Sequence, residues 1–170
     1  MADDALITRL ENPTDADAVR RVETAAFGRP DEAAIVDAIR GTPDEVCSIV
    51  GELAGEVLCH AFFTLVTVAE MPSLRACALG PVAVEPSHQS AGIGGATIRD
   101  GIERCKAEGW QAMFVLGDPR YYGRFGFELA APVGFHYSNH DFDRAFQMQW
   151  LSGPPAGDAG GWVVYHSAFG

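Results

Sequence analysis

The spacing of apolar and polar positions along the chain predicts an alternation of strands and helices. Runs rich in β-branched, leucine and phenylalanine residues predict strands over residues 6–10, 46–53, 56–68, 75–84, 110–116, 146–151 and 162–166, with another starting at Phe127. Helical spacing predicts helices up to Phe27, over 31–40, over roughly 92–108 and, shorter, over 120–125. Strands, a strand–helix–strand crossover and then further strands predict a mixed α/β sheet in a single domain spanning 1–170.

Turn and capping residues set the expected ends of these elements. Ala54-Gly55 predicts a two-residue hairpin turn between two strands. Thr14 with Asp17 three residues later predicts the cap of the first helix. Asp118 before Pro119 predicts a capped short helix, because proline is well suited to the first helical position.

The stretch from 79 to 95 organises the chain. Val82, Ala83 and Val84 show no polar alternation, which predicts a strand covered on both faces and ended by Pro86. A glycine-rich turn then opens the helix at about Gly92. The free N–H groups and dipole of such a helix start favour an anion, most often a phosphate.

Two common phosphate motifs do not fit this turn. The dinucleotide fingerprint needs glycine at position 97, where the chain has Thr97. A nucleotide P-loop needs Gly-Lys-Ser/Thr, and lysine occurs once in the chain, at Lys106. A dinucleotide-binding redox domain is therefore disfavoured.

Two ordered motifs carry a resemblance instead. Gln89-x-x-Gly92-x-Gly94 resembles the Q/R-x-x-G-x-G/A motif with which the GNAT superfamily of N-acetyltransferases holds the pyrophosphate of acyl-CoA. The stretch 121–127, Tyr-Tyr-Gly-Arg-Phe-Gly-Phe, resembles a second GNAT signature, Phe-Tyr-x-Arg-x-Gly-Phe. Leu-Gly-Pro at 79–81, Gly-Asp-Pro at 117–119 and the end of the chain from Tyr165 to Phe169 are similar to a bacterial branch of the superfamily. The resemblance spans about 6–169 and is specific over 79–127.

The resemblance implies a GNAT fold, which is a central mixed, mostly antiparallel sheet with a splayed central strand pair, flanked by helices. It implies acetyl transfer from acetyl-CoA to a primary amine of a small molecule or protein, by direct attack in a ternary complex. It places pantetheine along the strand and the pyrophosphate on the glycine turn. The implied cofactor-binding residues are Val82, Ala83, Val84, Gln89, Ser90, Ala91, Gly92, Ile93, Gly94, Gly95 and Arg124.

The resemblance also implies catalytic roles. Tyr122 stands where the family has a tyrosine near the CoA sulfur, and a phenol can protonate a departing thiolate. The resemblance identifies no base. His60 is the predicted base from its residue type alone, because imidazole titrates near neutral pH, although a lone histidine in a strand is more often a core residue with satisfied hydrogen bonds. Glu70, Glu85 or water are the alternatives. Phe27 and Arg29 are expected near the acceptor.

Positions 89–91 lack the basic residue that many family members carry. Either CoA binds more weakly, or Arg99 or Arg124 compensates. A non-catalytic acyl-CoA-binding module is accordingly the alternative function.

Composition narrows the partners and the compartment. The net charge of −11 and the single lysine disfavour nucleic acid. The acidic N-terminus lacks a secretory pattern, and the apolar run over 61–69 is too short to cross a membrane, which together predict a cytoplasmic protein. Four cysteines without a C-x-x-C pair predict reduced buried thiols and no metal. A sheet edge near the C-terminus could support a homodimer, which follows from the habit of the superfamily that the chain resembles.

Overall fold

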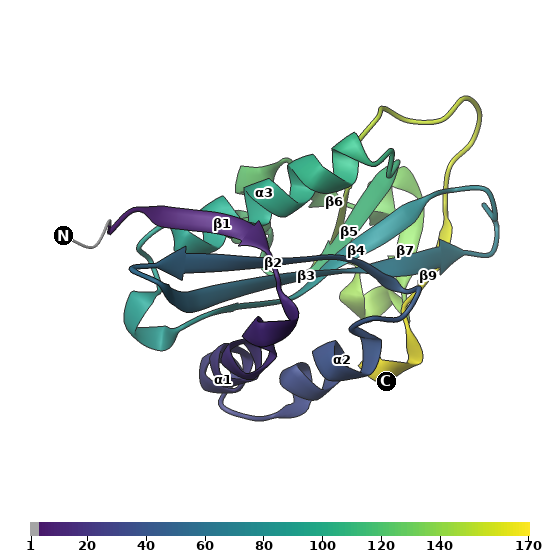
Figure 1. The fold of residues 1–170 in the computed structure, drawn as a ribbon. Coiled ribbons are helices and arrows are strands. Elements are labelled where there is room, and N and C mark those ends of the chain that lie inside the picture. The colour runs from purple at the N-terminus through teal and green to yellow at the C-terminus, as the bar shows by residue number, and fades with distance from the viewer. Residues whose placement is uncertain (1–3) are drawn as a thin grey trace. The chain divides into compact units, whose positions relative to one another are not determined.

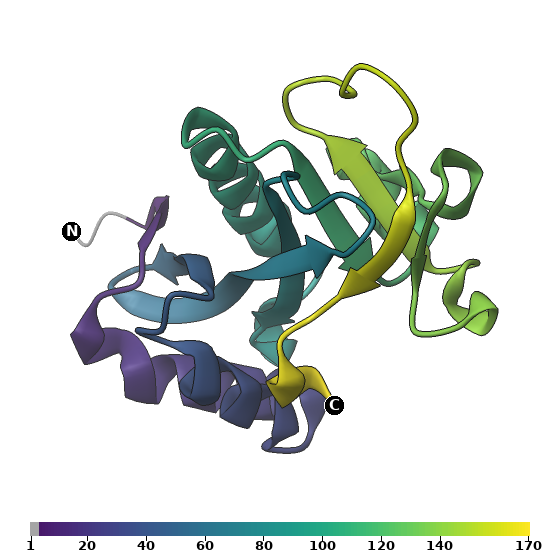
Figure 2. The same cartoon turned by 90° about the vertical axis from the view of Figure 1, so that its right-hand side faces the viewer.

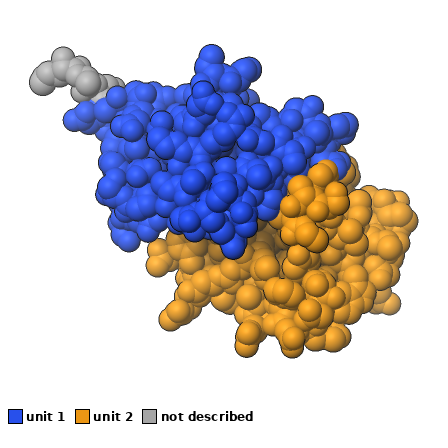
Figure 3. Space-filling model, turned by 90° about the horizontal axis from the view of Figure 1, so that it is seen from below, with its two compact units in different colours: residues 1–63, 81–104 blue, residues 64–80, 105–170 orange. Residues whose placement is uncertain are grey.

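The computed structural model describes residues 4–170, which form two compact units (Figures 1 and 3). The first holds the residues up to 63 together with 81–104, and the second holds 64–80 together with 105–170. Both units are built from two stretches of chain, so neither corresponds to one half of the sequence. The sequence prediction of a single domain stays a prediction.

The first unit has two helical layers around a group of strands. It contains β1 (Leu6–Leu10), α1 (Ala16–Phe27), α2 (Asp31–Ile39), β2 (Glu45–Leu53) and the beginning of β3 (Glu56–Val68). The end of β4 (Ala76–Val84) and most of α3 (Ile93–Ala107) complete it. The strands run between α1 and α2 on one face and α3 on the other (Figures 1 and 2).

The hairpin between β2 and β3 forms at the two residues that the sequence indicates. Ala54 and Gly55 have φ values of 51° and 80°, and both therefore adopt the left-handed conformation. Such a pair matches the twist of the strands that it connects. On the other side of β2, β1 pairs antiparallel, with Leu6 opposite Leu53 and Leu10 opposite Ile49.

The second unit is built mainly from strands. It contains the end of β3, the beginning of β4, β5 (Ala112–Leu116), α4 (Pro119–Tyr122), β6 (Glu128–Leu129), β7 (Phe135–Tyr137), β8 (Phe146–Trp150) and β9 (Gly161–Val164). β5 pairs parallel with β4 and antiparallel with β8, and β6 pairs antiparallel with β8. Phe114 is central to the core, because its ring stacks on Phe146 at 5.4 Å and meets the edge of Phe135 at 5.2 Å.

The strands follow the hydrogen-bonded order β1-β2-β3-β4-β5-β8-β6. β9 pairs antiparallel with β3 and parallel with β7. Within residues 4–170, this mixed, mostly antiparallel arrangement of nine strands confirms the predicted fold class. The observed β1, β3 and α3 lie within a residue of their predicted bounds.

The predicted cap of α1 was wrong. The backbone N–H of Asn12 donates to Asp15 Oδ2 at 2.7 Å, so Asn12 and Asp15 cap this end through a short 3-10 turn that precedes α1. Arg9 also holds Asp15, and its hydrogen bond lowers the pKa of that carboxyl group. Asp17 instead pairs with Arg20 on the surface of the helix. Both Asp15 and Asp17 satisfy the local spacing rule, and the contact with Arg9, which comes from the preceding strand β1, distinguishes them.

The region from 127 to 145 was predicted only in part. Phe127 precedes a strand of two residues, β6, and residues 131–142 form two 3-10 turns on either side of β7. Such short elements leave no periodic pattern to detect in the sequence.

Two compositional predictions concern burial. All four cysteines are buried thiols outside any disulfide, which confirms the prediction from their spacing. Among residues 4–170, no helix combines the length and the apolar character that crossing a membrane requires. The N-terminal pattern considered for secretion begins at Met1, outside the described residues.

Gly101 allows α3 to approach β3 closely, and this contact yields a stability prediction. A Cβ atom at position 101 would lie 2.2 Å from Phe63 Cε2. Alanine normally stabilises a helix interior by about 1 kcal/mol relative to glycine, but overpacking a core costs about 1–3 kcal/mol. We expect Gly101→Ala to lower the free energy of unfolding, as measured by urea denaturation.

The control is the double variant Phe63→Leu/Gly101→Ala. Leucine lacks the ring atoms that the new Cβ would meet, so the cost of the alanine should shrink in that background. A more stable Gly101→Ala single variant would contradict the assigned contact.

Candidate functional site

The glycine turn at the start of α3 has the predicted order of strand, break, turn and helix. β4 ends at Val84, and a 3-10 turn over Pro86–His88 follows it. Ser90 and Gly92 then adopt left-handed φ values of 67° and 83° before α3 begins. The left-handed conformation is uncommon and unfavourable for serine, so the surrounding contacts must hold Ser90 in it.

The first turn of α3 presents unpaired backbone donors. The first helical hydrogen bond runs from Ala96 N to Gly92 O, at 3.1 Å. The N–H groups of residues 92–95 consequently have no partner within the helix and lie at the positive end of its dipole. Residues 89–92 are exposed, and a Cβ at Gly92 would meet no atom within 4 Å. An anion can approach the backbone here.

Gly51 holds this helix start close to the strands. A Cβ atom at position 51 would lie 2.6 Å from Thr97 Oγ1 and 3.0 Å from the Cβ of Cys59. Thr97, the residue that excludes a dinucleotide fingerprint, is buried and donates to Ile93 O at 2.8 Å. The threonine therefore tightens the first turn of α3 against β2 and β3.

The end of β4 corrects the prediction that residues 82–84 are covered on both faces. Ala83 is 1% exposed, whereas Val82 and Val84 on the opposite face are only half-buried. Successive side chains alternate across a strand, and a run of three apolar residues does not reveal which face is covered. One face of this strand end therefore offers an apolar surface.

Tyr122 lies in the second unit, on the short helix α4. Asp118 Oδ1 accepts from Arg120 N at 2.9 Å, so the predicted Asp118–Pro119 cap is confirmed. The ring of Tyr122 meets the edges of Tyr121 at 5.0 Å and Phe127 at 6.1 Å. Burial, with a smaller effect of Tyr121, raises the pKa of Tyr122 to about 12. The phenol accordingly stays protonated at neutral pH.

Gly117 makes room for the Tyr122 ring. A Cβ atom at position 117 would lie 2.4 Å from Tyr122 Cε2. The backbone of Gly117 is fixed from both sides, because its N–H donates to Ala145 O at 3.0 Å and its carbonyl accepts from Gln147 Nε2 at 3.1 Å. Each residue of the Gly-Asp-Pro sequence at 117–119 thus helps to place Tyr122. Gly117 leaves space for its ring, Asp118 caps α4, and Pro119 is the first residue of that helix.

Arg124, the other candidate in this unit, is exposed, and its guanidinium group lies over the ring of Tyr121 at 5.6 Å. Its role toward a phosphate stays a prediction.

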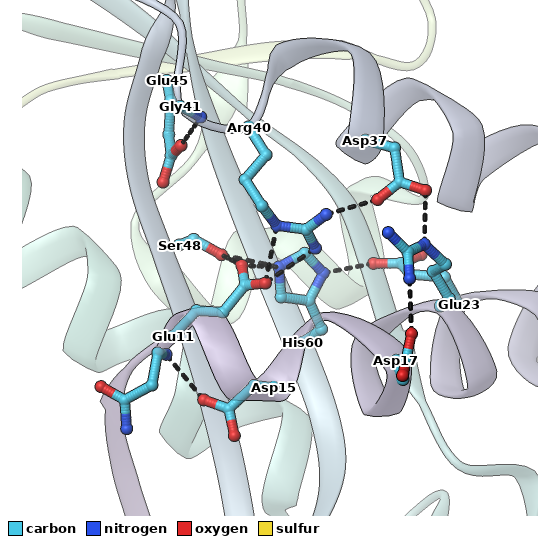
Figure 4. Close-up of polar contacts among 12 residues, drawn as sticks. Glu11, Asp15, Asp17, Glu23, Asp37, Arg40, Gly41, Glu45, Ser48 and His60 are labelled. Atoms are coloured by element: carbon cyan, nitrogen blue, oxygen red, sulfur yellow. Dashed lines mark hydrogen bonds and ion pairs between the residues drawn. The ribbon is translucent and has the colours of Figure 1, made fainter.

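His60 lies in a buried polar network of the first unit (Figure 4). Its Nδ1 is 2.6 Å from Glu23 Oε1 on α1, and its Nε2 is 2.8 Å from Ser48 Oγ on β2. Ser48 donates to Glu11, whose carboxylate also accepts from Arg40 Nε at 2.8 Å. The network thus links β3, α1 and β2 to the end of α2.

The protons of this network can be counted. Ser48 has one proton and donates it to Glu11, so its oxygen accepts from Nε2–H of His60. A second proton lies between His60 Nδ1 and Glu23 Oε1. Burial raises the pKa of Glu23, which favours keeping that proton in the buried pair.

This geometry bears on the predicted role of His60 as a base. The side chain is fully buried and both ring nitrogens have partners at hydrogen-bonding distance. In this conformation it can take a proton from an acceptor amine only through Ser48 or Glu23. The geometry therefore disfavours direct proton transfer from an amine to His60, and its catalytic role stays a prediction.

Glu70 and Arg29, two of the other candidates, are engaged in local contacts. Glu70 Oε2 accepts from Trp162 N at 3.2 Å, and Arg29 pairs with Glu32 at 2.5 Å. Phe27 is 41% exposed at the end of α1.

Sequence reasoning missed Glu23, Ser48 and Gly117. Glu23 had a usable signal, because it follows Val19 and Val22 on the face of α1 that the apolar spacing marks as buried. A carboxylate on such a face needs a buried partner. Gly117 was noted only as part of the Gly-Asp-Pro resemblance, because its contact with the Tyr122 ring five residues later depends on how the chain folds back.

Comparisons with known proteins agree with the motifs. The family model for an acetyltransferase (GNAT) domain matches residues 8–130. The chain is 39% identical over 127 residues to YjhQ of Escherichia coli K12, an uncharacterized N-acetyltransferase, covering 72% of this chain and 69% of that one. It is 28% identical to the E. coli N-acetyltransferase YhbS, covering 96% and 98% of the two chains.

Solved structures extend the likeness to the fold. The crystal structure of E. coli YhbS in complex with CoA superposes with a TM-score of 0.91 at 28% identity, covering 99% of this chain and 95% of that one. A GNAT family acetyltransferase from Brucella melitensis in complex with acetyl-CoA gives a TM-score of 0.82 at 34% identity, covering 98% and 99%.

The contact of Gly117 with Tyr122 yields a spectroscopic prediction. Alanine at position 117 would displace the ring from its buried place, so the pKa of Tyr122 should fall from about 12 toward the ordinary phenol value of about 10. We expect more tyrosinate absorbance at pH 11 in Gly117→Ala than in the parent protein.

The double variant Gly117→Ala/Tyr122→Phe is the control, because it lacks the displaced phenol. Equal absorbance changes with and without Tyr122 would argue against the assigned contact.

Proposed function

Because the chain belongs to the GNAT family of acetyltransferases, we propose that this N-acetyltransferase moves an acetyl group from acetyl-CoA to a primary amine by direct attack in a ternary complex. The observation that carries the cosubstrate assignment is the start of α3. It presents unpaired N–H groups behind an exposed glycine turn, directly after a strand with a half-open apolar face. The complexes of similar acetyltransferases with CoA and acetyl-CoA support it.

The residues present fit such a ligand by their chemistry. The N–H groups of residues 92–95 supply donors for a pyrophosphate without a basic side chain in the turn. Val82 and Val84 offer an apolar edge suited to pantetheine. A backbone N–H group in this strand would polarise the thioester carbonyl, and preorganised donors of this kind are worth about 3–4 kcal/mol in a transition state.

The transfer requires two proton movements. Acetyl-CoA supplies a thioester whose carbonyl carbon forms a bond to the amine nitrogen as the bond to sulfur breaks. We assign the proton for the leaving sulfur to the phenol of Tyr122, and the proton lost by the amine to water. His60 joins this scheme only if Ser48 or Glu23 relays a proton to it.

The raised pKa of Tyr122 sets the size of its contribution. A phenol with a pKa of about 12 remains protonated near neutral pH, so Tyr122 carries the proton that a general acid must donate. The same shift makes donation to sulfur less favourable. We therefore place its contribution at the lower end of the range for general acids, about 10²-fold.

The substrate is proposed only as a class, an amine of a small molecule or of a protein. The negative net charge favours a cationic acceptor in general terms. The alternative of a non-catalytic acyl-CoA-binding module would retain the α3 site and lack turnover.

Charge at the α3 turn should control cosubstrate affinity. Ala91 is exposed, so a new side chain there has room. A charge about 4 Å from the pyrophosphate contributes about 1 kcal/mol per phosphate charge in water. We expect acetyl-CoA to raise the melting temperature less in Ala91→Glu than in the parent, and more in Ala91→Arg, by differential scanning fluorimetry.

The two variants control for each other, because both add a long side chain at the same exposed position. The absence of any acetyl-CoA or CoA stabilisation in the parent would remove the basis of the proposal. Equal shifts in both variants would place the pyrophosphate elsewhere.

Substitution of Tyr122 should separate chemistry from binding. We expect Tyr122→Phe to lower kcat about 10²-fold, measured as CoA thiol release with a panel of amines, while stabilisation by acetyl-CoA is retained. Tyr121→Phe is the matched control and should keep most of its activity. A Tyr122→Phe variant with unchanged kcat would exclude the acid role, and a parent protein that binds acetyl-CoA without turnover would favour the binding module.

A further inference from the structure

Two histidines and an aspartate form a compact cluster in the second unit. His136 lies on β7, His140 begins the 3-10 turn that follows it, and Asp143 comes directly after that turn. One ligand atom from each of the three residues falls within 4.8 Å of the others. The proposed acetyl transfer assigns no role to any of them.

The aspartate connects the two imidazole rings. Asp143 Oδ1 lies 2.8 Å from His136 Nδ1, and Asp143 Oδ2 lies 2.9 Å from His140 Nδ1. The two rings meet edge to face, with 4.8 Å between their centroids. Each carboxylate oxygen is therefore directed at a different histidine, and the nitrogens converge on one carboxyl group.

The framework around the cluster is rigid on one side. β7 pairs parallel with β9, and the register places His136 opposite Trp162. The indole of Trp162 lies 5.1 Å from the His136 ring and 5.2 Å from the His140 ring, measured between centroids. Trp162 thus backs both imidazoles and limits the positions that they can adopt.

We propose that His136, His140 and Asp143 bind a divalent transition-metal ion, with zinc as the best match. Imidazole nitrogen and carboxylate oxygen are the ligand types that zinc, copper and nickel take in proteins. Zinc bonds to these atoms at about 2.0–2.2 Å, so tetrahedral ligand atoms lie about 3.3 Å apart. The Asp143–histidine spacings of 2.8 and 2.9 Å must therefore open slightly, while the widest separation in the cluster, up to 4.8 Å, must close toward this value.

The exposure of the cluster agrees with a site open to solvent. The side chain of His140 is 71% exposed, while those of His136 and Asp143 are 22% and 24% exposed. An ion can therefore enter without unfolding the turn, and three protein ligands leave a coordination position for water. The bound ion would tie the turn after β7 to the strand pair β7–β9.

The sequence expectation of no metal rested on the spacing of the cysteines. The ligands proposed here follow the spacing His-x3-His-x2-Asp, over residues 136–143. Such short spacing becomes visible as a site only once the turn brings the three side chains to one place.

The test uses the full chain without a histidine tag, after treatment with a chelator. Zinc affinity is measured by competition with a chromophoric chelator, and copper(II) binding by quenching of tryptophan fluorescence, to which Trp162 contributes as one of three tryptophans. We expect saturable binding of one ion per chain. His140→Ala, at the most exposed ligand, should weaken the affinity at least about tenfold, as should Asp143→Asn.

His88→Ala is the matched control, because it removes a histidine from the other unit and should leave the affinity unchanged. Circular dichroism of each variant verifies that it is folded. Absence of saturable zinc binding, or equal affinities in the parent and in folded His140→Ala and Asp143→Asn, would overturn the proposal. Because the readout needs neither acetyl-CoA nor an amine, the result is independent of the proposed acetyl transfer.

Discussion

The close approach of α3 to β2 and β3 is the constraint on which the candidate cosubstrate site depends. It requires glycine at positions 51 and 101, since a methyl group at either one would overlap Thr97 or Phe63. Thr97 in turn bonds to the carbonyl of Ile93, in the first turn. The helix end is thereby held in place by packing several residues away from the exposed glycines that would meet a ligand. The anion binding proposed for this helix end therefore depends on the close packing of α3 against β2 and β3.

The polar network around His60 is buried, whereas the glycine turn before α3 is exposed to solvent. The network of Glu11, Glu23, Ser48 and His60 is buried between α1 and the strands, and its protons are shared among groups that solvent does not reach. Breaking one member would leave a buried polar partner unsatisfied, which is costly in a protein interior. The network therefore joins α1 and the end of α2 to β2 and β3 in a defined arrangement.

The sequence predicted those parts of the fold and site that depend on local chemistry. The turn at Ala54-Gly55, the cap at Asp118 and the glycine start of α3 follow from backbone preferences of a few adjacent residues. The failures share another cause. Asp15 rather than Asp17 serves the cap because Arg9 reaches it, and the burial of His60 depends on Glu23 from a helix that is distant along the chain. Apolar spacing can mark Glu23 as buried, but it does not identify which side chain of another element will be its partner.

The burial of the cysteines has a practical consequence for enzymology. All four thiols are buried, and burial raises the pKa of Cys59 to about 11. The nucleophilic form of a thiol is the thiolate, so the folded chain presents little that reacts with a disulfide dye. The free sulfhydryl of a released coenzyme would therefore be read over a low protein background. A slow rise in dye signal without acetyl-CoA would instead come from the protein thiols and report transient opening of the core, so the same reagent also measures the rate of local unfolding.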